Sequence, residues 1–495
     1  MAVNATVART ELAPGFTISR VLTGLWHIAD LEREGRVLDQ GKTAAAMAPY
    51  VAAGFTTFDM ADHYGSAEEI AGMFARGRAS GEPVQLLTKW VPKPGPLTRD
   101  DVRVAVRRSL DRLQQDAIDL LQFHAWNYAD ASWLDGLFWL QELREEGLIR
   151  HLGLTNFDAA HLGIVIRSGI EVVSNQVCFS LLDRRPRAGL TDLCLKHGVK
   201  LLAYGTVAGG FLSERWLDKP EPDWARLSTW SEMKYGRFIQ AAGGWAVFQH
   251  LLRTIHKVAQ GHDVSMANVA CRSILDEPAV GGIIVGARLG ASEHIDDNRR
   301  LFGFSLDAND RKEIEAAVQK LRPVPGNSGD EYRKPPYLTA SGDLSHHLES
   351  LPPPYPVKTG PDGRTLVLSG TEWETLAGFC RAVRRGDRIL VSGTTATHRD
   401  RPVGGSDVAA QTHFVIDKIE GALQSLGGRL EDVVRTRVYV RHVSDWEEAA
   451  RAHGDRFRAI LPANTLVQAE LVGDDYLVEM EAEAAVGPSV YNPAL

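Results

Sequence analysis

The N-terminal part of the chain alternates between short apolar segments of strand length and longer segments with helical periodicity. Such alternation is typical of a parallel sheet wound with helices, and eight strands can close into a barrel. The pattern therefore predicts an α/β fold, specifically a (β/α)8 TIM barrel. The expected strands are residues 22–26, 56–60, 85–89, 120–124, 151–155, 173–177, 200–204 and 282–285, and the expected helices are residues 43–53, 67–78, 100–113, 133–146, 158–168 and 187–197.

The loop after the second expected strand holds a carboxylate, Asp59, and a phenol, Tyr64. In a TIM barrel this loop lies at the rim where catalytic residues gather. An unperturbed tyrosine has a pKa of about 10, so it exchanges protons poorly near neutrality unless an ammonium favours the phenolate. The next strand ends in such a group, Lys89, which a carboxylate would hold in place. The strand after that ends in His124, which is suited to hydrogen-bond a substrate carbonyl.

These four residues, with the run Phe58-Asp59-Met60-Ala61-Asp62-His63-Tyr64-Gly65, resemble the catalytic tetrad and signature of the aldo-keto reductase superfamily. The resemblance implies an NADP-dependent oxidoreductase in which Tyr64 protonates a carbonyl oxygen while NADPH delivers hydride to its carbon. It also implies that Lys89 and Asp59 tune the tyrosine and that His124 orients the carbonyl.

Polar residues at later strand ends extend the resemblance to a nicotinamide site. Taken singly, Asn156 is explained as a helix N-cap and Gln176 as a structural amide. Taken together they resemble the family's site, where an Asn and a Gln hold the carboxamide and a Tyr stacks on the ring. The expected cofactor contacts here are Thr155, Asn156, Gln176, Tyr204 and Gly205.

The eighth strand leads into an expected anion site. Backbone amides at a helix N-terminus and an arginine suit a phosphate monoester, and the resemblance implies that this segment binds the adenosine 2′-phosphate and adenine. Gly286, Arg288 and Asn298 match, while His294 stands where an arginine or glutamine is frequent. NADPH is therefore favoured over NADH, and the alternative is that Arg288 pairs with a surface carboxylate.

Aromatic residues near the rim are candidates for the substrate pocket. Trp26, His27 and Trp90 are expected to line it, although a plain loop histidine is the alternative for His27. Residues 216–235 show no period and predict a long irregular loop. Within it, Trp224 and Trp230 either contact substrate or fix the loop to the barrel.

A change in composition predicts a second domain. We expect the barrel in residues 1–322, a Pro- and Gly-rich linker in residues 323–362 with a short helix near 344–348, and an α+β domain in residues 363–495. The runs at 387–394, 434–440 and 478–482 resemble the RidA (YjgF) family, with its chorismate-mutase-like fold. Members of that family are usually trimers, and their active members hydrolyse enamines and imines.

The RidA-like cleft departs from the family pattern at one position. The arginine that binds a substrate carboxylate by a bidentate fork is Asn464 in this chain, which carries no charge. Glu479 matches the family's water-activating glutamate, with an exposed strand carboxylate as the alternative. A trimer-forming role or a ligand without a carboxylate is therefore favoured over hydrolysis of amino-acid imines.

Composition limits the classes of function. The chain has 495 residues, 44% hydrophobic and 24% charged, which suggests two or three globular domains. A net charge of −8 argues against a general nucleic-acid binder. No signal peptide or membrane-spanning run is visible, so we expect a cytoplasmic protein. The four cysteines lack metal-ligand spacing, so neither a metal site nor a disulfide framework is expected.

The leading hypothesis is an NADPH-dependent carbonyl reductase whose second domain assembles a homo-oligomer, a trimer, or handles a reactive intermediate. Its partner would be a small-molecule carbonyl or imine. One alternative is a two-step fusion enzyme that acts on an imine or enamine. Another is an NADPH-sensing binding protein, because a fold alone does not fix a function.

Overall fold

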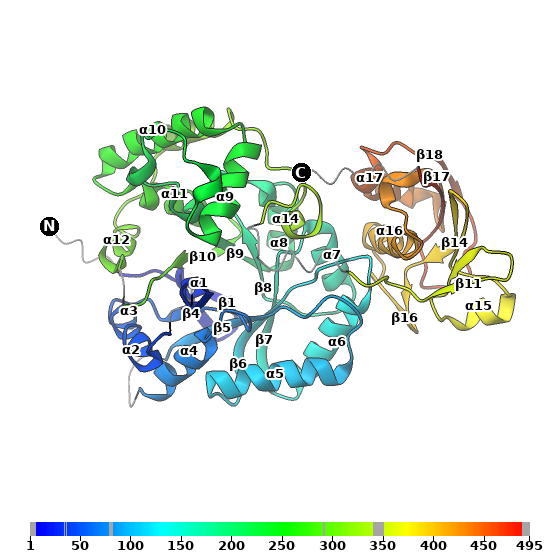
Figure 1. Cartoon of the computed structure of the whole chain (residues 1–495), viewed down its shortest axis with the longest axis horizontal. Helices are drawn as coiled ribbons and strands as arrows, with labels where there is room; N and C mark the ends of the chain where they lie inside the picture. Colours follow the sequence, from blue (N-terminus) through cyan, green and yellow to red (C-terminus); the bar gives the residue numbers. More distant parts are fainter. Residues whose placement is uncertain are drawn as a thin grey trace.

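Eight parallel strands of the computed structural model close into a barrel, which confirms the fold class predicted for this part of the chain (Figure 1). The structure describes residues 6–33, 35, 37–78, 83–290, 293–339 and 351–487. The barrel closes where the last strand pairs with the first, with Ile283 opposite Val21. An antiparallel hairpin, β1 (Arg9–Ala13) and β2 (Phe16–Ser19), precedes the barrel strands β3 (Val21–Gly24), β4 (Thr57–Asp59), β5 (Gln85–Trp90), β6 (Ile118–Phe123), β7 (Ile149–Thr155), β8 (Ser174–Cys178), β9 (Lys200–Tyr204) and β10 (Val280–Gly286).

Helices connect the strands and cover the outside of the barrel (Figure 1). Local sequence fixes where several of them begin. The Asp158 side chain accepts a hydrogen bond from the backbone N–H of His161 at the start of α7, and Thr98 forms a capping box with Asp101 at the start of α5. These helices are α1 (Trp26–Arg33), α2 (Gln40–Ala45), α3 (Ala48–Ala52), α4 (Ala67–Arg76), α5 (Arg99–Leu113), α6 (Ser132–Glu145), α7 (Ala159–Arg167) and α8 (Leu190–His197).

The segment after β9 is more regular than its sequence predicts. Residues 216–235 were expected to be irregular, but Trp230 begins helix α9, which Thr229 caps by accepting a hydrogen bond from the backbone N–H of Glu232. The segment around this cap is rich in Trp and Pro, and that composition obscures the helical periodicity in the sequence. The remaining barrel helices are α9 (Trp230–Ala241), α10 (Trp245–His262), α11 (Met266–Leu275), α12 (Ile295–Arg300) and α13 (Ala308–Val318), with short 3-10 turns at η1 (Arg185–Arg187), η2 (Ala208–Gly210), η3 (Glu214–Trp216) and η4 (Trp224–Arg226).

Part of the expected linker packs against the barrel. Residues 330–333 form helix α14 (Asp330–Arg333), in which Asp330 and Glu331 are buried. A freely solvated linker would leave both carboxylates exposed, so the segment before residue 340 is an integral part of the barrel's packing. The helix expected near residues 344–348 lies outside the described residues.

The C-terminal domain is an α+β unit, as predicted, and its mixed sheet has seven strands. Helices α16 and α17 cover one face of the sheet, and α16 lies between the sheet and the barrel (Figure 1). The sheet order is β11-β12-β13-β14-β19-β17-β18. The elements are β11 (Val357–Thr359), β12 (Thr365–Val367), α15 (Glu372–Ala377), β13 (Ala382–Arg385), β14 (Arg388–Thr395), β15 (Thr397–His398), β16 (Arg401–Pro402), α16 (Val408–Ser425), η6 (Leu430–Asp432), β17 (Val433–Val440), η7 (Val443–Asp445), α17 (Trp446–Phe457), β18 (Ala463–Gln468) and β19 (Val478–Ala485).

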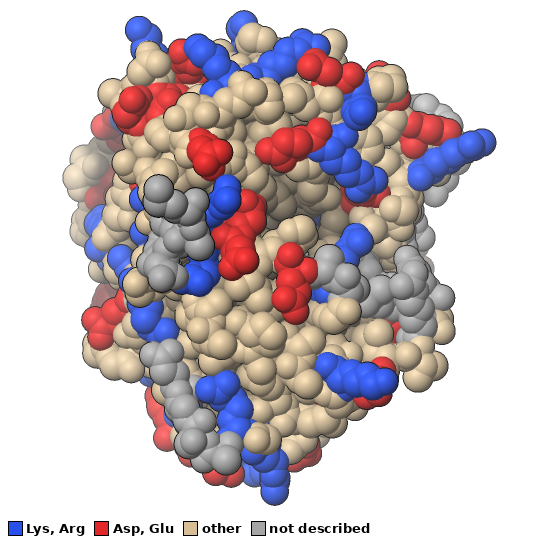
Figure 2. All heavy atoms as spheres, turned by 90° about the vertical axis from the view of Figure 1, so that its left-hand side faces the viewer, with Lys and Arg blue, Asp and Glu red and all other residues tan. Residues whose placement is uncertain are grey.

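Charges of both signs are distributed over the surface. On the face shown in Figure 2, Lys and Arg side chains are interspersed with Asp and Glu, without a continuous basic area among the described residues. Cys178, Cys194 and Cys271 are buried and Cys380 is half-buried, and all four are free thiols. No helix within the described ranges is long and apolar enough to cross a membrane.

Candidate active site

A cavity of about 570 Å³ opens at the C-terminal ends of the barrel strands. Polar side chains from six strands or strand ends enter it, which is where a TIM barrel places its chemistry. Of the residues predicted for the catalytic, cofactor and substrate sites of the barrel, all except Trp90 line this cavity. They are Asp59, Tyr64, Lys89, His124, Thr155, Asn156, Gln176, Tyr204, Gly205, Gly286, Arg288, His294, Asn298, Trp26 and His27.

The Lys89 ammonium is held between two oxygens beside Tyr64. Its Nζ lies 2.7 Å from Asp59 Oδ2 and 2.7 Å from the Met60 carbonyl oxygen, and 4.9 Å from the centre of the Tyr64 ring. Burial lowers the pKa of Lys89, and the Asp59 carboxylate opposes that shift. A cation therefore lies next to the phenol, in the arrangement that stabilises a phenolate.

His124 is a neutral imidazole directed at the same cavity. Its side chain is 3% exposed, and burial lowers its pKa well below the usual value, with the Arg333 guanidinium adding to the shift. Within the described part of the chain neither ring nitrogen has a side-chain or backbone hydrogen-bond partner of ordinary geometry. A neutral ring with an unsatisfied N–H can donate to a carbonyl oxygen without contributing a second positive charge.

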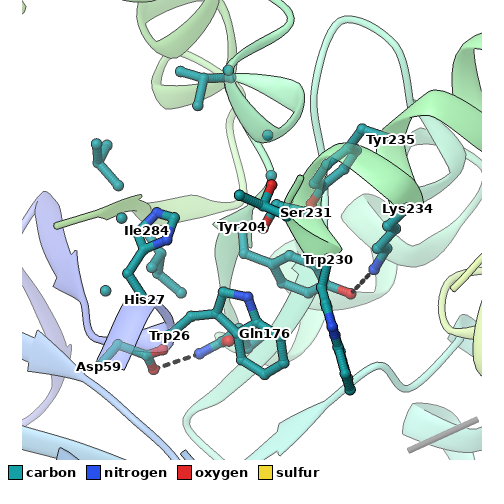
Figure 3. A pocket seen from close by; sticks show the side chains of 18 of the residues that line it. Trp26, His27, Asp59, Gln176, Tyr204, Trp230, Ser231, Lys234, Tyr235 and Ile284 are labelled. Atoms are coloured by element: carbon teal, nitrogen blue, oxygen red, sulfur yellow. Dashed lines mark hydrogen bonds between the residues drawn. The ribbon is translucent and has the colours of Figure 1, made fainter. Parts of the chain in front are cut away.

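The predicted nicotinamide contacts form one hydrogen-bonded set with the tetrad. Gln176 Nε2 donates to Asp59 Oδ1 at 2.7 Å and to Gln122 Oε1 at 2.9 Å, so its amide oxygen is left to accept from a ligand (Figure 3). Tyr204 donates to Asn156 Oδ1 at 2.8 Å. Two amides and a phenol ring at one wall of the cavity fit a nicotinamide carboxamide and its ring.

The part of the cavity beside β10 and α12 is lined by the residues expected to form an anion site. Arg288 is exposed, and it forms no ion pair with any carboxylate in the described ranges, contrary to the alternative that a surface carboxylate neutralises it. His294 and Asn298 line the same part, at the start of α12. This part of the cavity therefore has a cation available for a phosphate.

Tryptophan side chains line part of the cavity, but Trp90 is not one of them. The Trp90 ring is 5% exposed and packs 5.5 Å from Phe123 in the core, because successive strand residues point to opposite faces and Lys89 already points inward. Trp126 takes the expected place, with its ring 4.5 Å from that of His124. Trp26 begins α1 instead of ending a strand, and its ring lies 4.8 Å from that of Tyr64.

Trp230 and Trp224, which the sequence left undecided, take different roles. Trp230 lines the cavity with its ring 6.3 Å from that of Trp26, and Figure 3 shows the two rings near each other. Trp224 packs 5.9 Å from Trp245 and fixes its loop to the barrel.

Sequence reasoning missed a buried charged cluster contributed by α14. Glu331 lies 2.8 Å from Arg185 Nη2 and 3.6 Å from Lys234 Nζ. Lys234 in turn donates to Tyr332 at 2.8 Å. It also donates to Tyr204 at 3.3 Å (Figure 3). Tyr332 lines the cavity 5.8 Å from His124. No local motif marks these residues, because the segment reads as a Pro- and Gly-rich linker.

The two residues expected in the RidA-like cleft lie apart within one chain. Asn464 on β18 donates to Thr436 Oγ1 at 2.9 Å, whereas Glu479 on β19 is separated from it by β17. Glu479 packs over Gly393, whose carbonyl accepts a 2.6 Å hydrogen bond from Arg381. Burial raises the pKa of Glu479, and Arg381 opposes that shift. A buried arginine thus accompanies the glutamate, from a position that sequence reasoning did not identify.

The closed barrel, with its cavity at the C-terminal ends of the strands, is the fold of a class of oxidoreductases that act on carbonyls. The chain belongs to the aldo/keto reductase family, whose model matches residues 20–319. Residues 370–486 match the model described as Endoribonuclease L-PSP, so a RidA/YjgF domain follows the reductase barrel in the same chain.

Individual relatives resemble one or the other domain. An uncharacterized protein of Streptomyces coelicolor is 38% identical over 122 residues, which are 24% of this chain and 91% of that protein. The chloroplastic pyridoxal reductase of Arabidopsis thaliana is 25% identical over 290 residues, 54% of this chain and 74% of that protein. A glycerol dehydrogenase from Gluconobacter oxydans has the same barrel fold, with a TM-score of 0.53 and 21% identity over 66% of this chain and 98% of its own.

Replacing Glu331 with Gln should destabilise the barrel by about 3–5 kcal/mol, because it leaves the buried Lys234 without its carboxylate and leaves Arg185 paired with Asp183 alone. Burial opposes ionisation of Glu331, yet the two cations lower its pKa from 4.5 to about 2. A depressed folded-state pKa gives stability that is present above pH 4.5 and is lost as the pH falls toward 2. Urea unfolding between pH 7 and pH 3 should show this slope in the parent chain and a reduced slope in Glu331→Gln.

The control is Glu315→Gln, which removes a carboxylate from exposed pairs with Arg184 and Arg187. Exposed pairs contribute at most about 1 kcal/mol. Equal losses for the two variants would contradict the assignment of Glu331 as the anchor of α14.

Proposed function

We propose that the barrel catalyses NADPH-dependent reduction of an aldehyde or ketone, with Tyr64 as the general acid. The observation that carries this proposal is the Lys89 ammonium, bound by Asp59 and lying 4.9 Å from the Tyr64 ring in the same cavity. Bound NADPH would supply the hydride. Thr155, Asn156, Gln176, Tyr204 and Gly205 would hold its nicotinamide, and Gly286, Arg288, His294 and Asn298 its adenosine end.

The protein's own side chains supply and position the proton that the carbonyl oxygen receives. A carbonyl oxygen between Tyr64 and His124 would accept hydrogen bonds from both, and the oxygen gains negative charge as the carbon is reduced. Tyr64 donates its proton to that oxygen, and Lys89 stabilises the phenolate that forms. Asp59 keeps the ammonium beside the ring, and the neutral His124 positions the oxygen without competing for the proton.

The walls of the cavity favour a substrate with a flat apolar body. Trp26, Trp126 and Trp230 surround the space in front of Tyr64 and present aromatic faces and edges. Aromatic pairs gain energy beyond that of area burial. An aromatic aldehyde therefore suits this pocket, and the pyridoxal reductase relative acts on a compound of that kind.

Tyr64→Phe should lower kcat for reduction of an aromatic aldehyde by about 10²- to 10⁴-fold, because it removes the proton donor and leaves the ring in place. NADPH oxidation measured at 340 nm reports the rate. Tyr337→Phe removes a hydroxyl from a partly exposed tyrosine away from the cavity and should retain the parent rate. Unchanged turnover in Tyr64→Phe would exclude Tyr64 as the acid.

Arg288→Met should raise the KM for NADPH about 10- to 100-fold, since hydrogen bonds to a charged group contribute about 1.5–3 kcal/mol. The KM for NADH should change by less than about twofold, because NADH has no 2′-phosphate. Arg226→Met, which removes an exposed arginine paired with Asp223, is the control. An equal increase in both KM values would show that Arg288 does not distinguish the two cofactors.

We also propose that the C-terminal domain assembles the chain into a trimer. The sheet face opposite α16 carries partly exposed side chains, including Leu390 and Val467 at 46% and 44% exposure. The ion pair of Arg437 with Glu481 and the bond from Tyr439 to Glu481 lie on the same face. A sheet face that combines apolar side chains with paired polar groups is suited to pack against other copies of the chain.

Val467→Lys should shift the chain from trimer to monomer, because a lysine on this face, at its edge strand β18, would bring like charges together in the assembly. Light scattering at micromolar concentration measures the mass. Val443→Lys, on the exposed turn η7, places the same charge away from the sheet and should leave the mass unchanged. A monomeric parent chain would refute the proposed assembly.

A further inference from the structure

The loop that carries Asn156 is held in an unfavourable conformation. Asn156 has φ of 62°, in the left-handed region that asparagine tolerates better than most residues but still at a cost. It is fixed from the barrel side by its backbone N–H, which donates to the Gln176 carbonyl at 2.8 Å, and by Tyr204, which donates to its side chain. Such a conformation persists only where the surroundings determine it strongly.

Helix α14 contributes part of those surroundings. Arg333 Nη1 donates to the Asn156 carbonyl at 2.7 Å, and the Arg333 guanidinium lies 4.3 Å from the centre of the Tyr128 ring. Gly329 has φ of 85° and lies so close to the Asn156 carbonyl that any Cβ there would collide with the oxygen. The Tyr128 hydroxyl also points toward this carbonyl, at 3.5 Å.

The other side of the loop faces the C-terminal domain. Asp158, two residues after Asn156, caps α7 and lies 2.7 Å from His161 Nδ1. The other ring nitrogen of His161 lies 3.0 Å from Asp417 Oδ2 on α16. His161 stacks on Tyr128 with a centroid separation of 3.4 Å and an interplanar angle of 8°. The imidazole thus connects α16 to Asp158, which lies two residues after Asn156, and to Tyr128, whose hydroxyl points toward the Asn156 carbonyl.

Charge fixes the position of the His161 imidazole in this connection. Asp158, His161 and Asp417 are all at most 5% exposed, and Arg456 Nη1 on α17 lies 2.6 Å from the second oxygen of Asp417. Burial alone would lower the pKa of His161, but the two carboxylates raise it, so the ring is held as a cation between them. A buried cation with two fixed anions has one favourable position. Moving Asp417 would therefore move the imidazole and the loop.

We propose that Asp417 of the C-terminal domain is a positioning residue for the barrel's cofactor site: through His161 and Asp158 it holds the loop that places Asn156 against the nicotinamide. This inference rests on the proposed use of a nicotinamide cofactor at Asn156. It gives the RidA-type domain a role in the reductase reaction that differs from assembly. Asp417 acts through His161 and Asp158 and does not itself contact the reacting atoms.

Asp417→Asn tests the proposal, because it keeps the shape of the side chain and removes the charge that faces His161. We expect the KM and Kd for NADPH to rise about tenfold, with kcat at saturating cofactor within about twofold of the parent. The matched control is Glu420→Gln on the same helix, which loses a 2.5 Å pair with Arg456 but does not contact His161. That control should retain the parent KM, and Asp417→Glu should restore part of the affinity.

Amide hydrogen exchange gives a readout that needs no cofactor. The amides of Asn156 and Phe157 should exchange at least tenfold faster in Asp417→Asn than in Glu420→Gln. If Asp417→Asn does not fold, Gly421→Ala is the second variant, because a Cβ there would meet the Ala129 carbonyl and force α16 away from the barrel. It should give the same increase in KM and in exchange.

The outcomes separate this inference from the proposed function. Parent-level KM and exchange in a folded Asp417→Asn would overturn the inference while leaving the reductase proposal intact. A parent chain that neither binds nor oxidises NADPH would overturn the proposed function. In that case slower or unchanged exchange at Asn156 in Asp417→Asn would still reject the positioning role, and faster exchange would support it.

Discussion

The buried pairing of Asp59 with Lys89 is the interaction on which the site depends. One oxygen of Asp59 binds the Lys89 ammonium, and the other accepts from Gln176 and from Gln122 at 3.2 Å. A single carboxylate therefore fixes both the cation beside Tyr64 and the Gln176 amide, which is proposed to contact the nicotinamide. Removing two charges from water is costly, and only a barrel that surrounds them with hydrogen-bond partners makes the arrangement tolerable. The cation beside Tyr64 and the Gln176 amide are thereby constrained to move together.

The residues that sequence could locate are those whose position follows from strand geometry. Strand ends in a parallel barrel converge at one rim, so Asp59, Lys89, His124 and Gln176 could be placed together before any coordinates were known. Successive side chains of a strand point to opposite faces, so Lys89 and Trp90 cannot both point into the barrel. This alternation excludes Trp90 from the cavity. Trp90 lies near the rim, but its position in the alternation directs its ring toward Phe123 in the core.

Other parts of the site depend on contacts between distant segments, and no local pattern reports them. Glu331 is buried only because Arg185 and Lys234, 146 and 97 positions earlier in the chain, supply its counter-charges. Tyr332 enters the cavity as a consequence of that burial. A segment rich in Pro and Gly resembles a linker in the sequence, whether or not it packs against another part of the protein. Likewise, the partnership of Glu479 with Arg381 arises from the pairing of strands that lie far apart in sequence.

The connection between the domains is consequently part of the reductase. Residues 329–333 lie beyond the matched reductase segment, which ends at residue 319, yet they contact Asn156, Tyr204 and His124. Helix α16 continues the same support through His161. A barrel cut at the family boundary would lose the Glu331 carboxylate that pairs with Lys234, together with Arg333, which donates to the carbonyl of Asn156. The segments after the matched reductase region therefore contact the loop of Asn156 directly through Arg333 and indirectly through His161 and Asp417.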